Sequence, residues 1–286
     1  MLSVGGWSGS NTFTGLVATD TARADFVSTL DTALNDYGFD GLDLDWEYPG
    51  KAGATNDFDV ANDLNNYLDF FKSLREKIGN DKLISSDTSS GPWVGADGKP
   101  SSDLSGFGDV LDFITIMTYD AVTYSSTATG PNFAFDSSCA PSTQQFSFAA
   151  SVQSWTDAKF PASKIMLGLA SYGYAWKVAE FKDGGGVEGA TSGIYQTATG
   201  TLSAADGSKS YDKIMSDKDM DYTFDDCSKT PFLYSSSSQM LITYDDPDSF
   251  AIKGAVAGNG LMGCSLYAAL TQNKDGTLRD AAKKVC

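Results

Sequence analysis

The stretch Phe39–Gly50, FDGLDLDWEYPG, interleaves acidic residues with bulky apolar ones. Successive side chains of an extended strand point to opposite faces, so Asp43, Asp45 and Glu47 share one face and the apolar residues between them share the other. A half-exposed strand of an antiparallel sheet, with solvated acids, is one interpretation. The apolar flanks and the helical segments on both sides favour a strand of a parallel sheet instead. The stretch therefore predicts a row of three carboxyl groups on such a strand.

Acids in this arrangement are suited to proton transfer. A buried acid is costly unless it is paired, protonated or used. Neighbouring carboxyl groups push their pKa values apart, so one of them can stay protonated near neutral pH while the other ionises. Glu or Asp becomes a general acid in this way. Glu47 stands last in the row, at the C-terminal end of the strand, which faces the substrate if the sheet is a barrel.

The four acids match the spacing DxxDxDxE, and in this the chain resembles the family 18 glycoside hydrolases, the chitinases and their relatives. The resemblance implies an α/β fold, a TIM (β/α)8 barrel. It also implies hydrolysis of chitin, a polymer of β-1,4-linked N-acetylglucosamine, by an endo-acting enzyme that retains configuration. Such enzymes use no protein nucleophile, because the acetamido oxygen of the sugar attacks its own anomeric carbon.

The resemblance also implies a role for each acid. Glu47 would protonate the glycosidic oxygen and then act as the base, so we expect an acidic pH optimum. Asp45 would orient the acetamido group and stabilise the oxazolinium ion, and Asp43 would share a proton with Asp45. Asp40 would be mainly structural.

A second motif lies in Val110–Tyr119, a nearly continuous apolar run that predicts a buried strand with Asp120 at its end. By itself this could be core packing followed by a helix-capping acid. The residues IMTYD resemble the MxYD motif of the same family. The resemblance implies that Tyr119 donates a hydrogen bond to the acetamido oxygen, that Asp120 contacts the bound sugar and that Met117 lies in the pocket wall.

A third motif is the glycine pair in Leu2–Trp7, LSVGGW, which reads as a strand that ends in a turn. It resembles the SxGGW motif on the third strand of family 18 barrels. The resemblance places Gly6 and Trp7 among the substrate-binding residues, and we expect Tyr48, beside Glu47, in the same set.

Two further aromatic positions are expected to bind substrate. Ile165–Tyr174 resembles the seventh barrel strand, in which Tyr172 fits the family's xYG pattern and Tyr174 stands where many members have Arg. Trp93 lies in the Ser-, Gly- and Pro-rich loop Asp87–Ser105. Long loops often carry binding residues, so Trp93 either stacks on a sugar ring or anchors its own loop.

Strands and helices alternate along the rest of the chain. Apolar periodicity predicts helices over about 21–37, with Phe26, Leu30, Leu34 and Tyr37 on one face, and over about 58–78, 143–159 and 276–285. A helix should also start at Pro247, and short strands at 82–86 and 261–270. We expect the barrel to comprise residues 1–176 and 244–286. The resemblance suggests a small α+β insertion domain over 177–243.

Three features depart from the family pattern. The chain starts at what looks like the third strand, so we expect six barrel strands and a barrel that is incomplete in this chain. The last strand presents Tyr267 where the family has Trp, and the smaller ring should bind a sugar more weakly. The stretch after Asp120 lacks an expected Trp and offers only Tyr124. A chitinase-like lectin that binds chitin oligosaccharides without cutting them, or a defective chain, are the alternatives.

Composition narrows the possible partners. With 286 residues, 41% hydrophobic and 20% charged, the chain is globular and long enough for one barrel-type domain. A net charge of −17 and a pI near 4.2 argue against nucleic acid, whereas a neutral polysaccharide is not repelled. The chain has no histidine, the commonest base and metal ligand. We therefore expect no metal and no cofactor, and chemistry carried by carboxylates, hydroxyls and the substrate.

The four cysteines show no close-spaced pair of the zinc or redox type. They permit two disulfides in any of three connectivities, which would suit a secreted monomer, but Cys264 sits in an apolar run and could equally be a buried thiol. No stretch reaches the ~18 apolar residues of a membrane span. No signal peptide is recognised after Met1, so a secreted protein would be present here in a mature, trimmed or truncated form.

Overall fold

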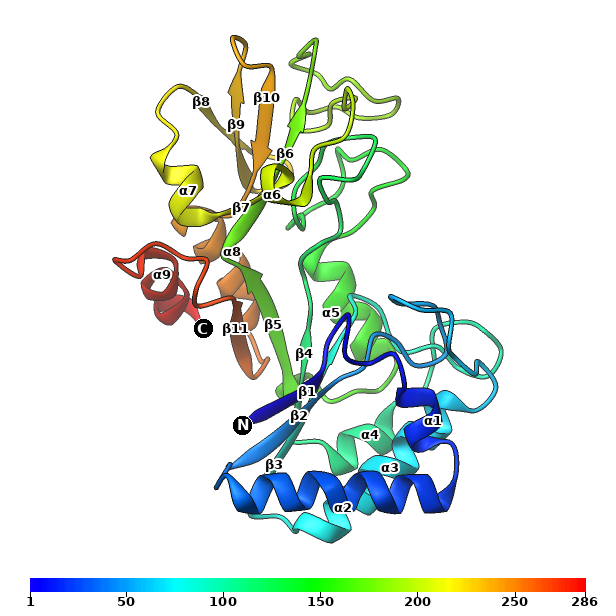
Figure 1. The fold of residues 1–286 in the computed structure, drawn as a ribbon. Helices are drawn as coiled ribbons and strands as arrows, with labels where there is room; N and C mark the ends of the chain where they lie inside the picture. Colours follow the sequence, from blue (N-terminus) through cyan, green and yellow to red (C-terminus); the bar gives the residue numbers. More distant parts are fainter. The chain divides into compact units, whose positions relative to one another are not determined.

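The computed structural model describes residues 1–286 (Figure 1). The chain divides into two compact units: unit 1 comprises Met1–Met117 and Val152–Met166, and unit 2 comprises Thr118–Ser151 and Leu167–Cys286. Six strands form a parallel sheet in the order β1-β2-β3-β4-β5-β11, and five form an antiparallel sheet in the order β7-β6-β10-β9-β8. The expected α/β class and the six barrel strands are therefore confirmed, together with a separate sheet of the kind expected of an insertion domain.

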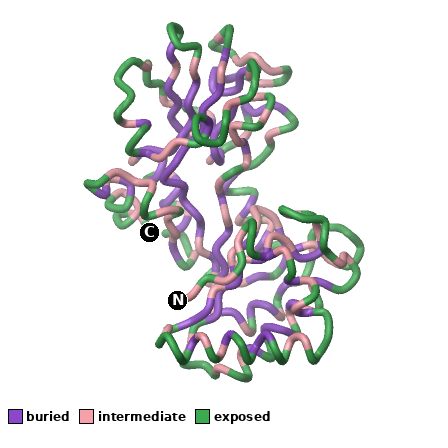
Figure 2. The backbone as a smooth tube through the Cα atoms, in the orientation of Figure 1, coloured by how far each residue is buried: buried purple, intermediate pink, exposed green.

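Unit 1 consists of parallel strands and the helices packed against them. The strands are β1 Leu2–Gly5, β2 Gly41–Asp45, β3 Leu83–Thr88 and β4 Phe113–Ile116. The helices are α1 Phe13–Val17, α2 Asp20–Asp36, α3 Asp63–Ile78 and α4 Ser105–Val110, and α5 Phe148–Asp157 ends in this unit. Buried positions dominate β2, β3 and β4 but not β1, and α2 and α3 alternate between buried and exposed residues (Figure 2).

Helix α2 follows the predicted periodicity except at its end. The Thr19 side chain caps the helix by accepting a hydrogen bond from the Ala22 N–H, and Phe26 and Leu30 are buried. The expectation that Tyr37 continues this face is wrong, since Tyr37 is 76% exposed. Tyr37 is the C-cap residue, so the helical periodicity ends before it.

Helix α3 starts later than its apolar pattern suggested, at Asp63 rather than near Phe58. The side chain of Asp63 is fully buried, and its Oδ2 accepts the N–H groups of Gly50 and Asp59 at 3.0 and 2.8 Å. The residues before Asp63 are therefore turned around a buried carboxylate, which ties the chain after the acidic strand to the start of α3.

An aromatic core holds the helices of unit 1 against the sheet. Tyr67 lies at its centre, fully buried, and the Trp93 ring packs 4.6 Å from Phe107 and 5.1 Å from Trp155 between ring centroids. Trp93 is only 2% exposed. Of its two alternative roles the structure shows the loop anchor, and the expected stacking of Trp93 on a sugar is wrong because an interior ring cannot reach one.

The apolar run Val110–Tyr119 is shorter as a strand than predicted. Its first residue ends α4, and β4 covers only Phe113–Ile116. Lys164 explains the break, because its Nζ donates to the carbonyl oxygens of Gly108 and Leu111, both at 2.7 Å. These bonds satisfy the last carbonyl groups of α4 and separate the helix from the strand.

Unit 2 contains the antiparallel sheet. Its strands are β6 Tyr172–Lys177, β7 Ser208–Ser210, β8 Asp221–Asp225, β9 Thr230–Ser235 and β10 Met240–Thr243. Its short helices are α6 Ala204–Gly207 and α7 Tyr211–Ser216, and its C-terminal part holds α8 Pro247–Ala257, β11 Gly263–Tyr267 and α9 Thr277–Val285. The 3-10 helix η1 Ala162–Lys164 precedes β5 Ile165–Ala170, which runs from unit 1 into unit 2.

The segment Ile165–Tyr174, expected to form a single strand, is divided between the two strands β5 and β6. It breaks at Ser171, whose N–H and hydroxyl donate to the carbonyl oxygens of Tyr267 and Ala268. Tyr172 therefore begins β6 and pairs with Ser210 of the antiparallel sheet. The antiparallel sheet starts at Tyr172 and thus before the predicted domain boundary at 177, while the domain division itself stays a prediction.

The local predictions made from the sequence of unit 2 agree with its structure. Helix α8 starts at Pro247, as predicted, and Asp246 and Ser249 form a reciprocal capping box at its first turn. The four cysteines form two disulfides, and of the three possible connectivities the structure has Cys139–Cys227 and Cys264–Cys286, so the free-thiol alternative for Cys264 is wrong. No helix among residues 1–286 is long and apolar enough to cross a membrane.

The turn after β1 depends on a glycine. Gly5 has φ +119°, and a Cβ there would lie 2.1 Å from the carbonyl oxygen of Asp45, an overlap of backbone atoms that cannot be relieved by side-chain motion. We expect Gly5→Ala to lower the free energy of unfolding by about 2–4 kcal/mol, measured by urea denaturation. Gly15→Ala in α1 is the matched control, because a Cβ there meets nothing within 4 Å. Equal stability of the two variants would contradict the steric argument.

Candidate active site

The acidic row lies on β2 of unit 1 and just beyond its end. Asp43 and Asp45 are half-buried on one face, whereas the apolar residues of the strand are fully buried on the other. Trp46 packs 5.6 Å from Phe13 and 5.0 Å from Tyr67 between ring centroids, which fixes the backbone as it leaves the strand. The Glu47 N–H then donates to Ser10 Oγ at 3.1 Å. The predicted alternation of the row is confirmed.

Asp43 is held by hydroxyl groups from both neighbouring strands. Ser3 Oγ on β1 donates to Asp43 Oδ2, and Ser85 Oγ on β3 donates to Asp43 Oδ1, both at 2.7 Å. The strand register places Ser3, Asp43 and Ser85 side by side. Because both oxygens accept, the arrangement suits an ionised carboxylate.

Asp45 is set up to carry a proton. Burial, and then the charges of Glu47 and Asp43, raise the pKa of Asp45 to about 7. Its Oδ1 is buried and has no hydrogen-bond partner. Gly6 leaves space beside it, since a Cβ at Gly6 would lie 3.7 Å from Asp45 Oδ2. Asp45 therefore combines a proton near neutral pH with an oxygen that no protein group satisfies.

The structure adds a fourth carboxyl group to the row, that of Asp87 on β3. Asp87 is the register partner of Asp45 on the neighbouring strand. Burial raises the pKa of Asp87 to about 8, and the charges of Asp43 and Asp45 contribute. The Ser-, Gly- and Pro-rich composition after it predicts Asp87 at the start of a loop. The signal that could have found it is the alternation of Ser85 and Asp87 in the strand that follows the acidic one.

Lys51 is a second side chain at the site that the sequence did not predict. Its Nζ lies 4.4 Å from the centroid of the Tyr48 ring and donates to Ser89 Oγ at 3.3 Å. Burial lowers the pKa of Lys51. The sequence offered no signal, because a lone lysine in a loop is usually solvated.

The remaining predicted residues of unit 1 differ in exposure. Trp7 is 54% exposed and is accessible to a ligand. Met117 is half-buried, and its N–H donates to the carbonyl of Thr88 at 2.7 Å. The side chain of Asp40 is exposed at the start of β2, away from the C-terminal end of the strand where Glu47 lies, and only its backbone carbonyl joins the sheet, accepting from the N–H of Leu83 at 3.0 Å.

In unit 2, the side chain of Asp120 accepts hydrogen bonds from two tyrosine hydroxyl groups. The hydroxyl groups of Tyr172 and Tyr174 both donate to Asp120 Oδ1, at 2.5 and 2.6 Å. The Asp120 N–H donates to Asn132 Oδ1 at 2.6 Å, which supports the positive φ of Asp120, 60°. Burial, and then the charge of Asp120, raise the pKa of both tyrosines, so they stay neutral donors. Asn132 is a site residue without any sequence signal.

Tyrosine rings surround this carboxylate. Tyr119 stacks on Tyr267 at 5.4 Å between centroids with an interplanar angle of 18°, and Tyr172 lies 6.3 Å from Tyr119 and 6.1 Å from Tyr267. Tyr267 is 57% exposed and presents a ring to solvent. Tyr124 packs against Tyr174 at 5.9 Å. Unit 1 thus brings together the predicted carboxyl groups, and unit 2 brings together Tyr119, Asp120, Tyr172 and Tyr267.

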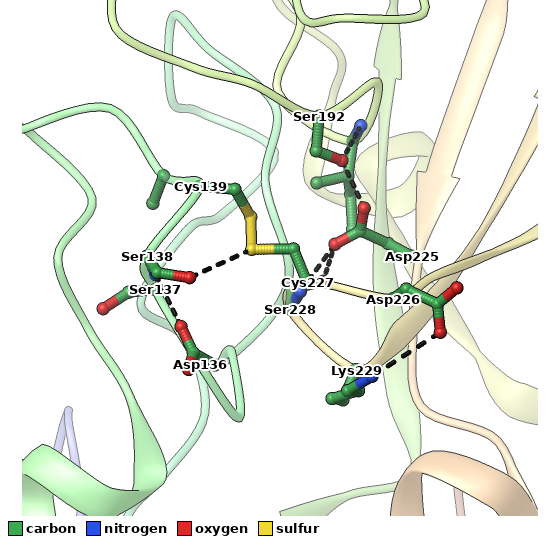
Figure 3. The surroundings of a disulfide bond; sticks show 12 residues. Asp136, Ser137, Ser138, Cys139, Ser192, Asp225, Asp226, Cys227, Ser228 and Lys229 are labelled. Atoms are coloured by element: carbon green, nitrogen blue, oxygen red, sulfur yellow. Dashed lines mark hydrogen bonds and ion pairs between the residues drawn. A yellow bond between two sulfur atoms is a disulfide. The ribbon is translucent and has the colours of Figure 1, made fainter.

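One cluster in unit 2 has the spacing of metal ligands. The sulfur atoms of Cys139 and Cys227 and a carboxylate oxygen of Asp225 lie within 4.8 Å of one another. The sulfurs are joined as a disulfide and so offer no thiolates, and Asp225 accepts hydrogen bonds from Ser192 and Ser228 (Figure 3). This arrangement favours a structural role for the cluster.

The raised pKa values predict how stability depends on pH. Asp45 and Asp87 bind protons more tightly in the folded chain than in the unfolded chain, where Asp titrates near pH ~3.9. The free energy of unfolding should therefore fall as the pH rises from about 4 to about 8. Asp87→Asn should be more stable than the wild type by about 1–3 kcal/mol at pH ~8.5 and equal to it near pH ~4, by urea denaturation. The control is Asp25→Asn, which changes an exposed acid on α2 and should keep the wild-type pH dependence of the free energy of unfolding. The prediction is contradicted if Asp87→Asn keeps that wild-type dependence as well.

Comparison with known proteins agrees with this geometry. The model of the family described as glycosyl hydrolases family 18 matches residues 1–271. A chitinase-like effector from Moniliophthora perniciosa is 33% identical over 96% of this chain and 69% of its own length. Chitinase A1 from Niallia circulans is 29% identical over 99% of this chain and 42% of its own length. The crystal structure of a chitinase from Rhizomucor miehei superposes with a TM-score of 0.89 at 28% identity, covering 99% of this chain and 83% of that one.

Proposed function

This chain belongs to glycosyl hydrolase family 18, and from that premise we propose that it hydrolyses chitin, a β-1,4-linked polymer of N-acetylglucosamine, by a retaining, substrate-assisted mechanism. The observation that carries the proposal is the intact acidic row: Asp43 is held by two hydroxyl groups, Asp45 carries a proton near neutral pH, and Glu47 follows at the strand end. A protein that only bound sugar would not need carboxyl groups poised to exchange protons.

The proposed reaction has two steps. Glu47 gives its proton to the glycosidic oxygen while the acetamido oxygen of the same sugar attacks the anomeric carbon, and the leaving chain departs as an alcohol. Asp45 accepts the acetamido N–H and stabilises the oxazolinium ion. Glu47, now ionised, then takes a proton from water as the water opens the oxazolinium ring. This returns the proton to Glu47 and releases the sugar with its configuration retained.

The motif in unit 2 supplies the proposed sugar contacts. Tyr119 would donate a hydrogen bond to the acetamido oxygen. Asp120, which already accepts hydrogen bonds from two tyrosine hydroxyl groups, would accept another from a sugar hydroxyl. Tyr267 offers an exposed aromatic ring that could stack on a sugar face. Trp7, Gly6, Tyr48 and Met117 remain proposed contacts of the chitooligosaccharide. The two disulfides favour an oxidising, extracellular location for what we propose is a secreted monomer.

A second function is favoured by the names of two relatives. The chitinase-like effectors of Moniliophthora perniciosa and Moniliophthora roreri are 33% and 32% identical to this chain. Together with a tyrosine at position 267 in place of the family's tryptophan, this favours a chitin-oligosaccharide-binding protein that does not cut its ligand.

One experiment separates the two functions. Purified protein with a cooperative thermal unfolding transition is incubated with chitohexaose, and released products are measured by chromatography while tryptophan fluorescence follows binding. Trp7 is exposed and serves as a reporter. Released oligosaccharides with β configuration support the hydrolase. Saturable binding without any product would overturn it and establish the binding protein.

A further inference from the structure

Asp87 lies beside the acidic row without belonging to its motif. It lies on β3, where the register pairs it with Asp45 on one side and with Thr115 of β4 on the other. The next residue on the same face of β3 is Ser85, which donates to Asp43. Parallel neighbours in a sheet lie ~4.8 Å apart. The register therefore holds Asp87 directly opposite Asp45, and the side chain of Asp87 also reaches a hydrogen bond with Asp43, two residues earlier on β2.

The groups around Asp87 decide which carboxyl group carries a proton. Asp43 and Asp45 face it from β2, the Thr115 hydroxyl donates to it from β4, and the phenol of Tyr67 lies near it from α3. Glu47 adds its charge through Asp45. Carboxyl groups packed this closely cannot all ionise, so the row holds protons near neutral pH. Asp43 already accepts hydrogen bonds from two hydroxyl groups, so it is the acceptor and Asp87 is the donor in the bond between them.

We propose that Asp87 is a positioning residue of the hydrolytic reaction, which donates its proton in a hydrogen bond to Asp43 and thereby leaves the proton of Asp45 available at the reacting end of the row. The inference rests on the proposed hydrolase function. With Asp87 as donor, Asp43 accepts a further hydrogen bond beside those from Ser3 and Ser85 and does not draw on Asp45. Burial of Asp87, then the charges of Asp43 and Asp45, and last the hydrogen bond to Asp43 raise the pKa of Asp87 to about 8, which keeps the donor protonated at working pH.

Two substitutions separate this role from simple packing. Asn keeps the shape of Asp87, donates to Asp43 through its amide group and accepts from Thr115, but it cannot lose a proton. Ala removes the donor altogether. Activity requires protons on both Asp87 and the Asp45–Glu47 end, so log(kcat/KM) of the wild type should fall by about two per pH unit on its alkaline limb.

The expected results follow from those proton counts. Asp87→Asn should keep kcat within about threefold at the optimum, but its alkaline limb should fall by only about one per pH unit. Asp87→Ala should lose about tenfold in kcat with KM changed by less than about threefold. Asp25→Asn is the control and should match the wild type. An alkaline limb of equal steepness in the wild type and Asp87→Asn, or full activity in Asp87→Ala, would overturn the proposal.

A second measurement does not depend on turnover, so failure of the hydrolase proposal leaves the test intact. The infrared difference spectrum between the wild type and Asp87→Asn near pH ~7 should contain the C=O band of one protonated carboxyl group. Its absence would show that Asp87 is ionised and would overturn the inference, whether or not the protein cuts chitohexaose.

Discussion

Glu47→Gln should abolish the release of products from chitohexaose while oligosaccharide binding persists. The glutamine keeps the size and polarity of the side chain but has no proton that it can transfer, so only proton transfer is lost. We expect kcat to fall by about 10²–10⁴-fold, and the dissociation constant measured by tryptophan fluorescence to change by less than about threefold. Burial and the charge of Asp43 would still raise the pKa of Asp45 in the variant, and Asp45 would remain as the partner of the acetamido group.

The matched control is Glu76→Gln, which makes the same change at an exposed position of α3. It should turn over chitohexaose at the wild-type rate. Undiminished turnover by Glu47→Gln would remove the acid–base assignment. Loss of both turnover and binding would instead mean that Glu47 anchors the ligand, and a thermal unfolding scan of the variant then separates this from loss of fold.

Lys253→Met should cause the second large effect, on stability. Lys253 and Asp245 form an ion pair whose side chains are 1% and 3% exposed, and Lys253 Nζ donates to both carboxylate oxygens of Asp245, at 2.6 and 2.8 Å. Ser249 Oγ adds a third donor to Asp245. Removing the lysine leaves a buried charge without its counter-ion, so we expect the free energy of unfolding to drop by about 3–5 kcal/mol, measured by urea denaturation.

The double variant Lys253→Met/Asp245→Asn tests that explanation. It removes both charges and keeps a polar group for Ser249, so most of the lost stability should return. A double variant as unstable as Lys253→Met would show that the lysine acts through packing, for example through its position 5.0 Å from the centroid of the Phe148 ring, and not through the charge of Asp245.

Local patterns predicted those elements whose cause is local. The alternation of β2 follows from a period of two in the residues themselves. The start of α8 follows from Pro247 in its first turn and from Asp246 and Ser249, which cap each other within that turn. The sequence pattern predicted an element that is too long wherever a tertiary contact ends that element. Lys164, far along the chain, separates α4 from β4, and Ser171 divides the predicted seventh strand by bonding to the last residue of β11 and the residue that follows it.

The sequence by itself determined the family, the parallel sheet, the face of the acidic row and the residues of the tyrosine motif, because each depends on spacing along a short segment. Only the tertiary structure decided that Trp93 is a core residue, that Asn132 supports Asp120 and that Asp87 joins the acids. The physical reason is the same for all three. Burial and the pairing of carboxyl groups depend on which strands and loops become neighbours in space, and no single segment contains that information.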